Sequence, residues 1–299
     1  MPINRPIDDL PMPDRPVGNQ PATSSVVVDR LANAWYEHDQ AAHNGAKAIP
    51  ELPFRLSAVS NRCDRQMVYS MTNEPASNPP TIADSWRMGL GTMVHESLQS
   101  VLANFGDGWQ SEVTVDLRDI GVDGSGHVDL YNPATKTVVE LKTVNGFSFK
   151  MKATGFKGPA EGPSWAHILQ GALAARALGA DTMIIAYLSM ELVGPELARS
   201  YSTSEVGRFA AEWHYNMADL NPAVDKEIAR IRRLTAAARA GVLPSRMLDD
   251  PSIPAGASVV SPQTGNWSVV DAVGNVQQAG KVWFCNYCRY QDTCTAVKD

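Results

Sequence analysis

The sequence has 299 residues, of which 44% are hydrophobic and 19% charged, and its formal net charge is −6. A chain of this size can bury a large core, and its acidic balance argues against non-specific coating of nucleic acid. No apolar run is long enough to span a bilayer, so we expect no membrane partner. The start of the chain is rich in proline and lacks the basic and apolar regions of a secretory signal. We therefore expect a disordered tail over residues 1–23 and a cytoplasmic location.

The first elements expected after this tail are helices. They are predicted over residues 24–42, 58–71 and 84–104. Ser57 is suited to cap the second helix, which carries Cys63. In the third helix, Gly89 and Gly91 indicate that another element packs closely against it. His95 lies at the edge of the apolar stripe, where a half-buried histidine bonded to backbone is the simplest interpretation.

Three strands are expected next, over residues 110–117, 126–131 and 136–143. The last two form a hairpin in this prediction, because the sequence Asn-Pro-Ala-Thr between them favours a turn. Side chains two apart on a strand share a face, so Glu140 and Lys142 point one way and Leu141 the other. The turn can place Asp129 directly opposite Glu140. We expect these charged groups on the exposed face, with the apolar residues packed into a core.

Two carboxylates at this separation repel each other unless a positive charge neutralises them. Lys142 supplies part of that charge, and a divalent cation with oxygen ligands supplies more. The alternative is an ordinary solvated strand face, because Asp, Glu and Lys are common on exposed strands.

The second half of the chain continues the alternation of helix and strand. A long loop is predicted over 144–163, a helix over 164–178 and a strand over 182–190. Two helices broken at Pro222 are predicted over 203–220 and 223–240, and residues 251–280 are expected to be loop-like, with a short hairpin around Trp267. This order predicts a mixed α/β fold with peripheral helices.

Two stretches concentrate positive charge. One is the loop after Lys142, which carries Lys150, Lys152 and Lys157 among Phe147, Phe149 and Phe156. The other is the arginine-rich stretch 230–246, which includes Arg232 and Arg233. Basic and aromatic residues together suit a single nucleic-acid strand, through phosphate contacts and base stacking. A basic loop and a solvated helix face are the alternatives.

The cysteines predict a metal site. They are Cys63, Cys285, Cys288 and Cys294. Disulfides are rare in the cytosol, and four thiolates are enough for a tetrahedral zinc or a [4Fe–4S] cluster. The spacing does not choose between these two metals, and free structural cysteines are a third interpretation. A metal that joins Cys63 to the last three would clip the end of the chain onto its second helix and stabilise the fold.

Several of these residues follow one another in a characteristic order. They are Ser57…Cys63-x-Arg65…Tyr69, Gly91-x3-His95, Gly126-x2-Asp129, Glu140-x-Lys142, Gln170 and Cys285-x2-Cys288-x5-Cys294. In this order the chain resembles the RecB-like nucleases of the PD-(D/E)XK superfamily. Within them it looks like the iron–sulfur branch, formed by the CRISPR-associated RecB-type exonucleases and their phage relatives. The resemblance covers residues 56–294.

The resemblance implies a role for each matching residue. The catalytic Mg²⁺ or Mn²⁺ would be held by His95, Asp129, Glu140 and the backbone carbonyl of Leu141. Lys142 would orient the attacking water, and Gln170 would contact the DNA strand near the site. The four cysteines would hold a [4Fe–4S] cluster.

The chain departs from the family pattern at one position. The family has a Gln-x3-Tyr motif, but residue 174 is alanine here. His167, one turn before Gln170, is a candidate to replace the missing tyrosine, and a core or surface histidine is the other interpretation. Glu112, on the preceding strand, is a further candidate for the acidic shell of the site.

The resemblance implies a PD-(D/E)XK core of a mixed sheet flanked by helices, with helical additions and a C-terminal iron–sulfur clip. We expect a single nuclease domain over 24–299. Its parts are N-terminal helices (24–83), a catalytic core (84–190), a helical region (203–250) and an iron–sulfur segment (282–299).

The implied activity is a metal-dependent deoxyribonuclease, an exonuclease acting on single-stranded DNA ends with 5′→3′ polarity. The implied setting is the bacterial cytoplasm, or the host cytoplasm if a phage encodes the chain. Recombination or CRISPR-type protein partners and an oligomer fit the same family. Two alternatives stay open. One is a DNA-end processing or binding subunit that acts only within a partner complex, and the other is a zinc-stabilised nuclease without iron.

Overall fold

The computed structural model describes residues 30, 33–34, 36–37, 54–102, 106–156, 158–191, 209–282 and 284–297. The tail predicted over 1–23 and most of the helix predicted over 24–42 lie outside these residues. None of the described helices is long and apolar enough to cross a membrane.

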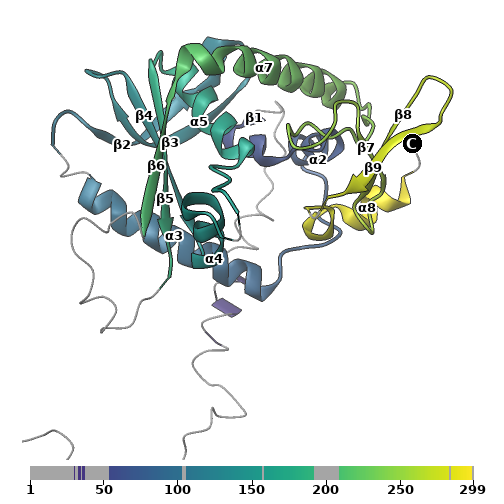
Figure 1. Cartoon of the computed structure of the whole chain (residues 1–299), viewed down its shortest axis with the longest axis horizontal. Helices are drawn as coiled ribbons and strands as arrows, with labels where there is room; N and C mark the ends of the chain where they lie inside the picture. The colour runs from purple at the N-terminus through teal and green to yellow at the C-terminus, as the bar shows by residue number, and fades with distance from the viewer. Residues whose placement is uncertain are drawn as a thin grey trace, which may run out of the picture.

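The described elements form two sheets and the helices around them (Figure 1). The strands are β1 (Phe54–Arg55), β2 (Gln110–Asp116), β3 (Gly124–Asn132), β4 (Thr137–Val144), β5 (Thr182–Ser189), β6 (Ala210–Asn216), β7 (Ser258–Ser261), β8 (Asn266–Val270) and β9 (Val276–Lys281). The helices are η2 (Leu56–Ser60), α2 (Asp64–Met71), α3 (Ile82–Leu102), η3 (Leu117–Ile120), α4 (Gly146–Phe149), η4 (Lys150–Thr154), α5 (Trp165–Ala177), α7 (Met217–Arg239), η6 (Phe284–Tyr287) and α8 (Gln291–Ala296).

The large sheet is mixed. β3 pairs antiparallel with β2 along one edge, and on its other edge it pairs with β1 near its start and with β4 near its end. β4 pairs parallel with β5, and β5 pairs antiparallel with β6. Because α5 connects the parallel strands β4 and β5, it must cross back over the sheet. The predicted mixed sheet flanked by helices is therefore confirmed.

Helices cover both faces of this sheet (Figure 1). On one face, Val138, Met183 and Ile185 pack with Leu169 and Leu173 of α5 in the main core. On the other face, a second cluster joins Leu130, Val139 and Leu141 to Leu98 of α3. The period-two pattern of β4 fits this arrangement, because Val138 and Val139 belong to different clusters.

Several sequence predictions of secondary structure differ from the fold. The helix predicted over 58–71 is two pieces, η2 and α2, with Cys63 in an extended conformation at the N-cap of α2. The loop predicted over 144–163 contains α4 and η4, capped by the Asn145 side chain. The asparagine cap starts a short helix here, although the basic composition of the segment favoured a loop in the sequence prediction.

The region predicted as helical over 203–220 contains strand β6. Residues 210–216 alternate half-buried and exposed side chains and pair with β5, so tertiary pairing decides their conformation. α7 then continues through Pro222, which lies near its N-terminal end and does not break it. The region predicted as loop-like over 251–280 contains the three-stranded sheet β7–β8–β9, which includes the hairpin predicted around Trp267.

The small sheet and the C-terminal segment lie beside α2, on the right of Figure 1. α8 is tied to the loop after α2, because the Asn78 side-chain oxygen accepts from Asp292 N at 3.1 Å and the Ser77 hydroxyl from Thr293 N at 3.2 Å. α7 runs from the large sheet towards the small one. These elements bring the end of the chain back to its second helix, as the sequence predicts.

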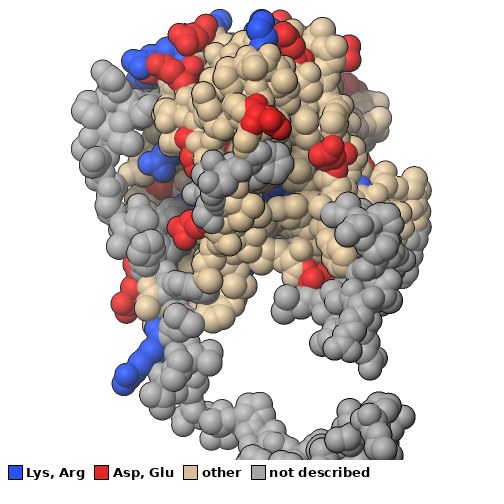
Figure 2. Space-filling model, turned by 90° about the vertical axis from the view of Figure 1, so that its left-hand side faces the viewer, with Lys and Arg blue, Asp and Glu red and all other residues tan. Residues whose placement is uncertain are grey.

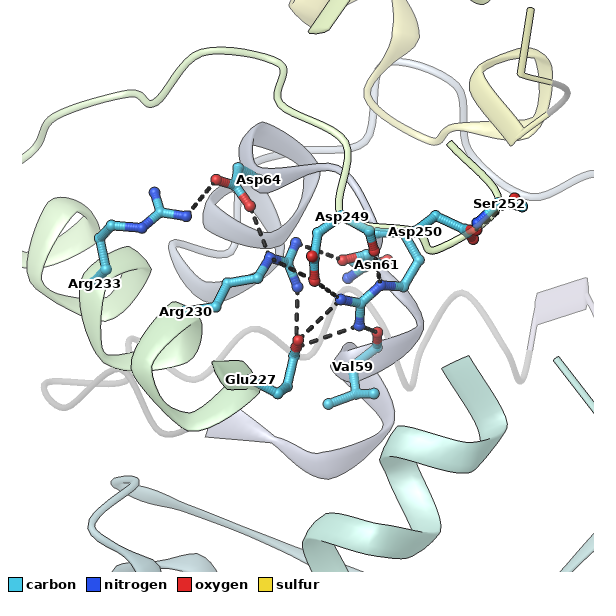
Figure 3. Close-up of polar contacts among 10 residues, drawn as sticks. Val59, Asn61, Asp64, Glu227, Arg230, Arg233, Asp249, Asp250 and Ser252 are labelled. Atoms are coloured by element: carbon cyan, nitrogen blue, oxygen red, sulfur yellow. Dashed lines mark hydrogen bonds and ion pairs between the residues drawn. The ribbon is translucent and has the colours of Figure 1, made fainter. Parts of the chain in front are cut away.

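A buried ion network joins α2, α7 and the segment before the small sheet (Figure 3). Glu227 of α7 accepts from Arg62 at 2.9 Å and from Arg230 at 3.0 Å. Arg230 also donates to Asp64 at 2.8 Å, and Arg62 contacts Asp249. Arg62, Asp64, Glu227 and Arg230 are all at most 7% exposed. Charges this deeply buried are tolerated because each has an opposite partner, so loss of one partner leaves the others uncompensated.

Replacement of Glu227 by alanine is expected to lower the free energy of unfolding by about 3–5 kcal/mol, because two arginines lose their shared carboxylate. Urea unfolding followed by circular dichroism measures this difference. Asp225→Ala, on the same helix, is the matched control: it removes an exposed pair with Arg176 and should cost less than about 1 kcal/mol. Equal losses in the two variants would contradict the assignment.

Candidate active site

The candidate site lies where β4 separates from β3. β1 pairs with β3 as far as Ser125, and β4 pairs with it from Leu130 onward. Between these contacts no described strand pairs with this edge of β3. The register that joins Leu130 to Val139 leads next to Asp129 opposite Glu140, as the sequence predicts. In this unpaired stretch the Asp129 side chain bonds to β4 in place of the backbone: its Oδ2 accepts from the backbone N–H of Leu141 at 2.6 Å.

α3 brings His95 to the same place. His95 Nδ1 lies 3.2 Å from the second oxygen of Asp129. This contact raises the pKa of His95 above its ordinary value, chiefly through the hydrogen bond to the Asp129 carboxylate. The predicted close packing of α3 is also present, since a Cβ on Gly91 would lie 3.6 Å from the Thr143 hydroxyl of β4. His95 therefore bonds a carboxylate, not the backbone.

Glu140 is the buried centre of the site. Its Oε1 contacts the Lys142 ammonium and accepts from Gln170 Nε2 at 2.8 Å. Lys142 Nζ lies 3.4 Å from Gln170 Oε1, so the side chains of Glu140, Lys142 and Gln170 all contact one another. α5 can lie this near to β4 because residue 171 is glycine: a Cβ there would meet the Met183 sulfur at 3.1 Å.

The charged face of the hairpin is not exposed, contrary to the sequence prediction. Glu140 is only 2% exposed, because α5 covers this face of the sheet. Burial raises the pKa of Glu140, and the neighbouring Asp129 adds to the increase while Lys142 opposes it. A buried carboxylate is costly unless it is paired, so this arrangement is not an ordinary solvated strand.

The site has the features of a cation site, although its geometry is not that of a bound ion. No three His, Cys, Asp or Glu side chains in the described ranges are arranged to hold a metal as they stand. However, Glu140 Oε2 is buried and accepts no hydrogen bond from the described residues. A buried acceptor of this kind calls for a partner, which can be a hydrogen-bond donor or a bound cation. With His95 and Asp129 beside it, the donor set is the one expected for Mg²⁺ or Mn²⁺, with one imidazole added.

His167 and Gln170 lie on the side of α5 that faces the site. His167 Nδ1 is 2.7 Å from the hydroxyl of Tyr187, which also accepts from Ser164 N at 3.0 Å. Tyr187 pairs in register with Lys142 across β4 and β5. Burial, together with smaller effects of Lys142 and Lys152, lowers the pKa of His167 to about 4. His167 is therefore beside the candidate site and neutral at pH 7.

The basic segment after β4 carries an aromatic pair. Phe147 and Phe156 meet edge to face with their ring centroids 5.7 Å apart, and both are largely exposed. Phe149, by contrast, is in the main core. Lys150 pairs with Glu191 and Lys152 with Glu161. Lys157 lies outside the described residues.

The arginine-rich stretch bonds mainly within the protein. Arg232 donates to the Gly121 carbonyl at 2.7 Å, and Arg233 donates to Asp64 at 2.6 Å. Arg230 and Arg246 are buried. On the face seen in Figure 2, basic and acidic side chains of the described residues are interspersed and form no continuous basic band. These contacts indicate that α7 uses its arginines to hold the fold. Glu112 of β2 is exposed, and its φ of 51° interrupts the pairing with β3.

The four cysteines line one small cavity together with Tyr69 and Arg246. All four are free thiols. Burial, with smaller contributions from neighbouring cysteines, raises the pKa of Cys63 to about 11 and that of Cys285 to about 12. Arg246 Nε lies 3.2 Å from Cys294 Sγ. The structure thus brings Cys63 to the other three, although their geometry is not that of a bound metal.

Comparison with family models finds no match, and comparison with curated proteins finds none either. Several solved structures resemble the fold at low identity. A phage-related exonuclease from Haemophilus somnus has 10% identity and a TM-score of 0.36, over 71% of this chain and 84% of that one. An alkaline exonuclease from Laribacter hongkongensis has 14% identity and a TM-score of 0.43, over 70% and 95%. Its complex with dAMP has 16% identity and a TM-score of 0.42, over 69% and 93%. Likeness at this level carries no argument about the activity of this chain.

Two residues of this region were not found from the sequence. Tyr187 was predicted only as part of a buried strand, and its place beside Lys142 depends on the parallel register of β4 and β5. Arg246 belongs to the stretch for which a phosphate-binding surface and a solvated helix face were both open, and it instead contacts a cysteine. No local pattern gives either contact, because each joins residues more than twenty positions apart.

The raised pKa of His95 gives a pH dependence in metal-free protein. A histidine whose folded pKa is raised stabilises the fold below about pH 6.5, and this stabilisation is lost as the pH rises through the folded pKa. In EDTA, wild type should therefore exceed His95→Gln in unfolding free energy at low pH, by an amount that shrinks as the pH rises. Urea titrations between about pH 6 and 9 measure this difference. In an Asp129→Asn background it should be absent. A difference that grows with pH would contradict the assignment.

Proposed function

We propose that this protein is a metal-dependent nuclease that hydrolyses phosphodiester bonds of DNA. The observation that carries the proposal is the buried Glu140, whose Oε2 has no partner in the described structure, beside Asp129, His95 and Lys142. Together with the resemblance of the motif order to RecB-like nucleases, this site supports the PD-(D/E)XK assignment. His95, Asp129, Glu140 and the Leu141 carbonyl would hold the ion.

The chemistry follows from what these side chains can do. A bound Mg²⁺ or Mn²⁺ supplies positive charge that makes water more acidic and offsets the charge that develops at phosphorus. With such an ion held by Glu140, Lys142 would no longer be needed to neutralise this carboxylate and would orient the attacking water. Gln170, which bonds both residues, holds their relative position and contacts the DNA strand. Asp129 keeps its second oxygen fixed through the Leu141 N–H.

We infer that the substrate is single-stranded DNA, cut from a 5′ end. The support is the segment 146–156, which follows Lys142 directly and exposes Phe147 and Phe156. An exposed aromatic pair can stack unpaired bases, and the nearby Lys150 and Lys152 can exchange their exposed carboxylate partners for phosphates. The polarity rests on the family resemblance alone. A DNA-end subunit that acts only in a partner complex remains the rival, favoured by Ala174 in place of the family tyrosine.

We also propose that the four cysteines hold a [4Fe–4S] cluster. The support is their convergence on one cavity, which joins Cys63 to a triplet more than two hundred positions later. A bound metal is what would keep such buried thiols deprotonated, since burial alone raises their pKa values. The residues fit a structural cluster, and they equally fit zinc, which is the alternative.

Replacement of Lys142 or Glu140 by alanine is expected to reduce DNA digestion at least about a thousandfold, because each loss removes a charge that stabilises the transition state. The assay follows end-labelled single-stranded, double-stranded and circular DNA with Mn²⁺. Lys136→Ala is the matched control: this lysine lies beside the start of β4 and forms an exposed pair with Asp181, so its loss should leave the rate unchanged.

If Lys142→Ala digests DNA as fast as wild type, the mechanism is wrong. Wild type that binds DNA ends tightly but digests none of these substrates would favour the partner-complex alternative. Rapid cutting of circular DNA would show endonuclease activity and exclude a strict exonuclease.

The cluster has a separate test. Protein purified without oxygen is expected to be brown, and Cys63→Ser should lose most of its iron and unfold more easily. The last effect follows because the clip between α2 and the C-terminal segment is lost. Iron analysis and visible absorption measure the loss of iron, and urea unfolding measures the loss of stability. Ser60→Ala, three positions earlier and exposed, should keep both its iron and its stability. Colourless protein with stoichiometric zinc would overturn the iron–sulfur assignment in favour of zinc.

A further inference from the structure

The pair His167–Tyr187 fixes where the proton sits on the imidazole ring. The Tyr187 hydroxyl already accepts from Ser164 N, and His167 Nδ1 is its second partner. Tyr187 is 1% exposed, so its hydroxyl proton has no access to water. Within the described residues, Nδ1 is the acceptor available to that proton. If Nδ1 carried a hydrogen instead, the tyrosine would be a buried donor without an acceptor, which is costly. His167 Nδ1 therefore accepts, and its hydrogen is on Nε2.

The Nε2–H group is positioned for a ligand. No described residue accepts from it, and the His167 side chain is partly exposed. Lys142 and Lys152 are close enough to act on the charge of the ring. Lys142 and Lys152 each pair with a carboxylate, Glu140 and Glu161, which offsets part of the positive charge near the ring. A nitrogen that carries a hydrogen cannot bind a metal ion, whereas it can donate to an oxyanion such as a phosphate oxygen.

The same residues lie along the expected path of a DNA strand. His167 is one turn before Gln170 on α5, and Tyr187 is the register partner of Lys142. A phosphate bound by His167 would therefore be next to the one being cut. Residue 174 is alanine, so one turn after Gln170 this face of α5 presents no polar side chain, whereas His167 lies one turn before Gln170.

We propose that His167 donates its Nε2–H to a non-scissile phosphate oxygen of the DNA strand, and that Tyr187 is the positioning residue that fixes the tautomer. This proposal rests on the proposed nuclease function. Tyr187 does not touch the DNA in this account. It acts by keeping Nδ1 occupied, so that the ring presents a donor and not an acceptor to the phosphate.

The tautomer is tested first, without any activity assay. Long-range ¹H–¹⁵N spectra of the full-length protein at pH 7 should show His167 neutral with its hydrogen on Nε2, assigned by loss of the signal in His167→Asn. In Tyr187→Phe the ring should become a mixture of tautomers. A hydrogen on Nδ1, or a charged ring, in wild type would overturn the proposal.

The phosphate contact is tested by binding. The probe is a fluorescent single-stranded oligothymidine in Ca²⁺, with one phosphate at a time replaced by a neutral methylphosphonate. His167→Ala should raise Kd about tenfold, and His167→Gln, which restores an N–H donor, should recover part of the loss. At one phosphate position, the methylphosphonate should weaken binding by wild type about tenfold but leave binding by His167→Ala nearly unaffected. His214→Ala, an exposed histidine paired with Glu212, is the control and should bind as wild type does.

The outcomes separate this proposal from the nuclease proposal. The phosphate contact is wrong if His167→Ala binds as tightly as wild type. It is also wrong if, at every phosphate, the binding losses caused by His167→Ala and by the methylphosphonate simply add. Either result stands even when Lys142→Ala no longer digests DNA. If wild type does not bind the oligonucleotide at all, the phosphate contact and the single-stranded substrate are both wrong, whereas the nuclease proposal is decided separately by the digestion assay. Tyr187→Phe with an unchanged tautomer would reject the positioning role alone.

Discussion

The candidate site of this protein is built around one buried carboxylate. Glu140 is held beneath α5 by Lys142 and Gln170, with its second oxygen unpartnered in the described structure. Burial of such a group opposes folding, so its retention calls for a role that a smaller or neutral side chain does not fill. The proposed cation, shared with Asp129 and His95, would fill that role. Without the cation, the Lys142 ammonium contacts Glu140 and neutralises the carboxylate.

The surrounding fold explains how these residues meet. The early separation of β4 from β3 opens an edge where Asp129 can bond to Leu141 N. α5 reaches Glu140 because Gly171 allows close approach, and α3 delivers His95 from the other face of the sheet. Further away, the Glu227 network fixes α2 against α7. α2 in turn presents Cys63 to the C-terminal segment. The proposed cluster and the candidate active site thus share one framework without sharing residues.

The sequence was sufficient for the strands that build the site, because period-two alternation and a turn set the register of Asp129 against Glu140. It was insufficient where a distant partner decides the outcome. Residues 210–216 have the composition of a helix end but become β6 beside β5. The hairpin pattern could not show that α5 would bury Glu140. The arginines of α7 looked available for phosphate until Asp64 and Glu227 were brought to them. Burial and long-range pairing are properties of the assembled fold, and a local pattern does not contain them.

The most direct test of the central claim is a crystal structure grown with Mn²⁺ at neutral pH, with anomalous scattering used to locate the ion. We expect manganese bound by Glu140, Asp129 and His95, with the Lys142 ammonium moved away from Glu140. Manganese bound elsewhere while Lys142 still contacts Glu140 would contradict the account, because the buried carboxylate would then be a structural ion pair and not half of a metal site.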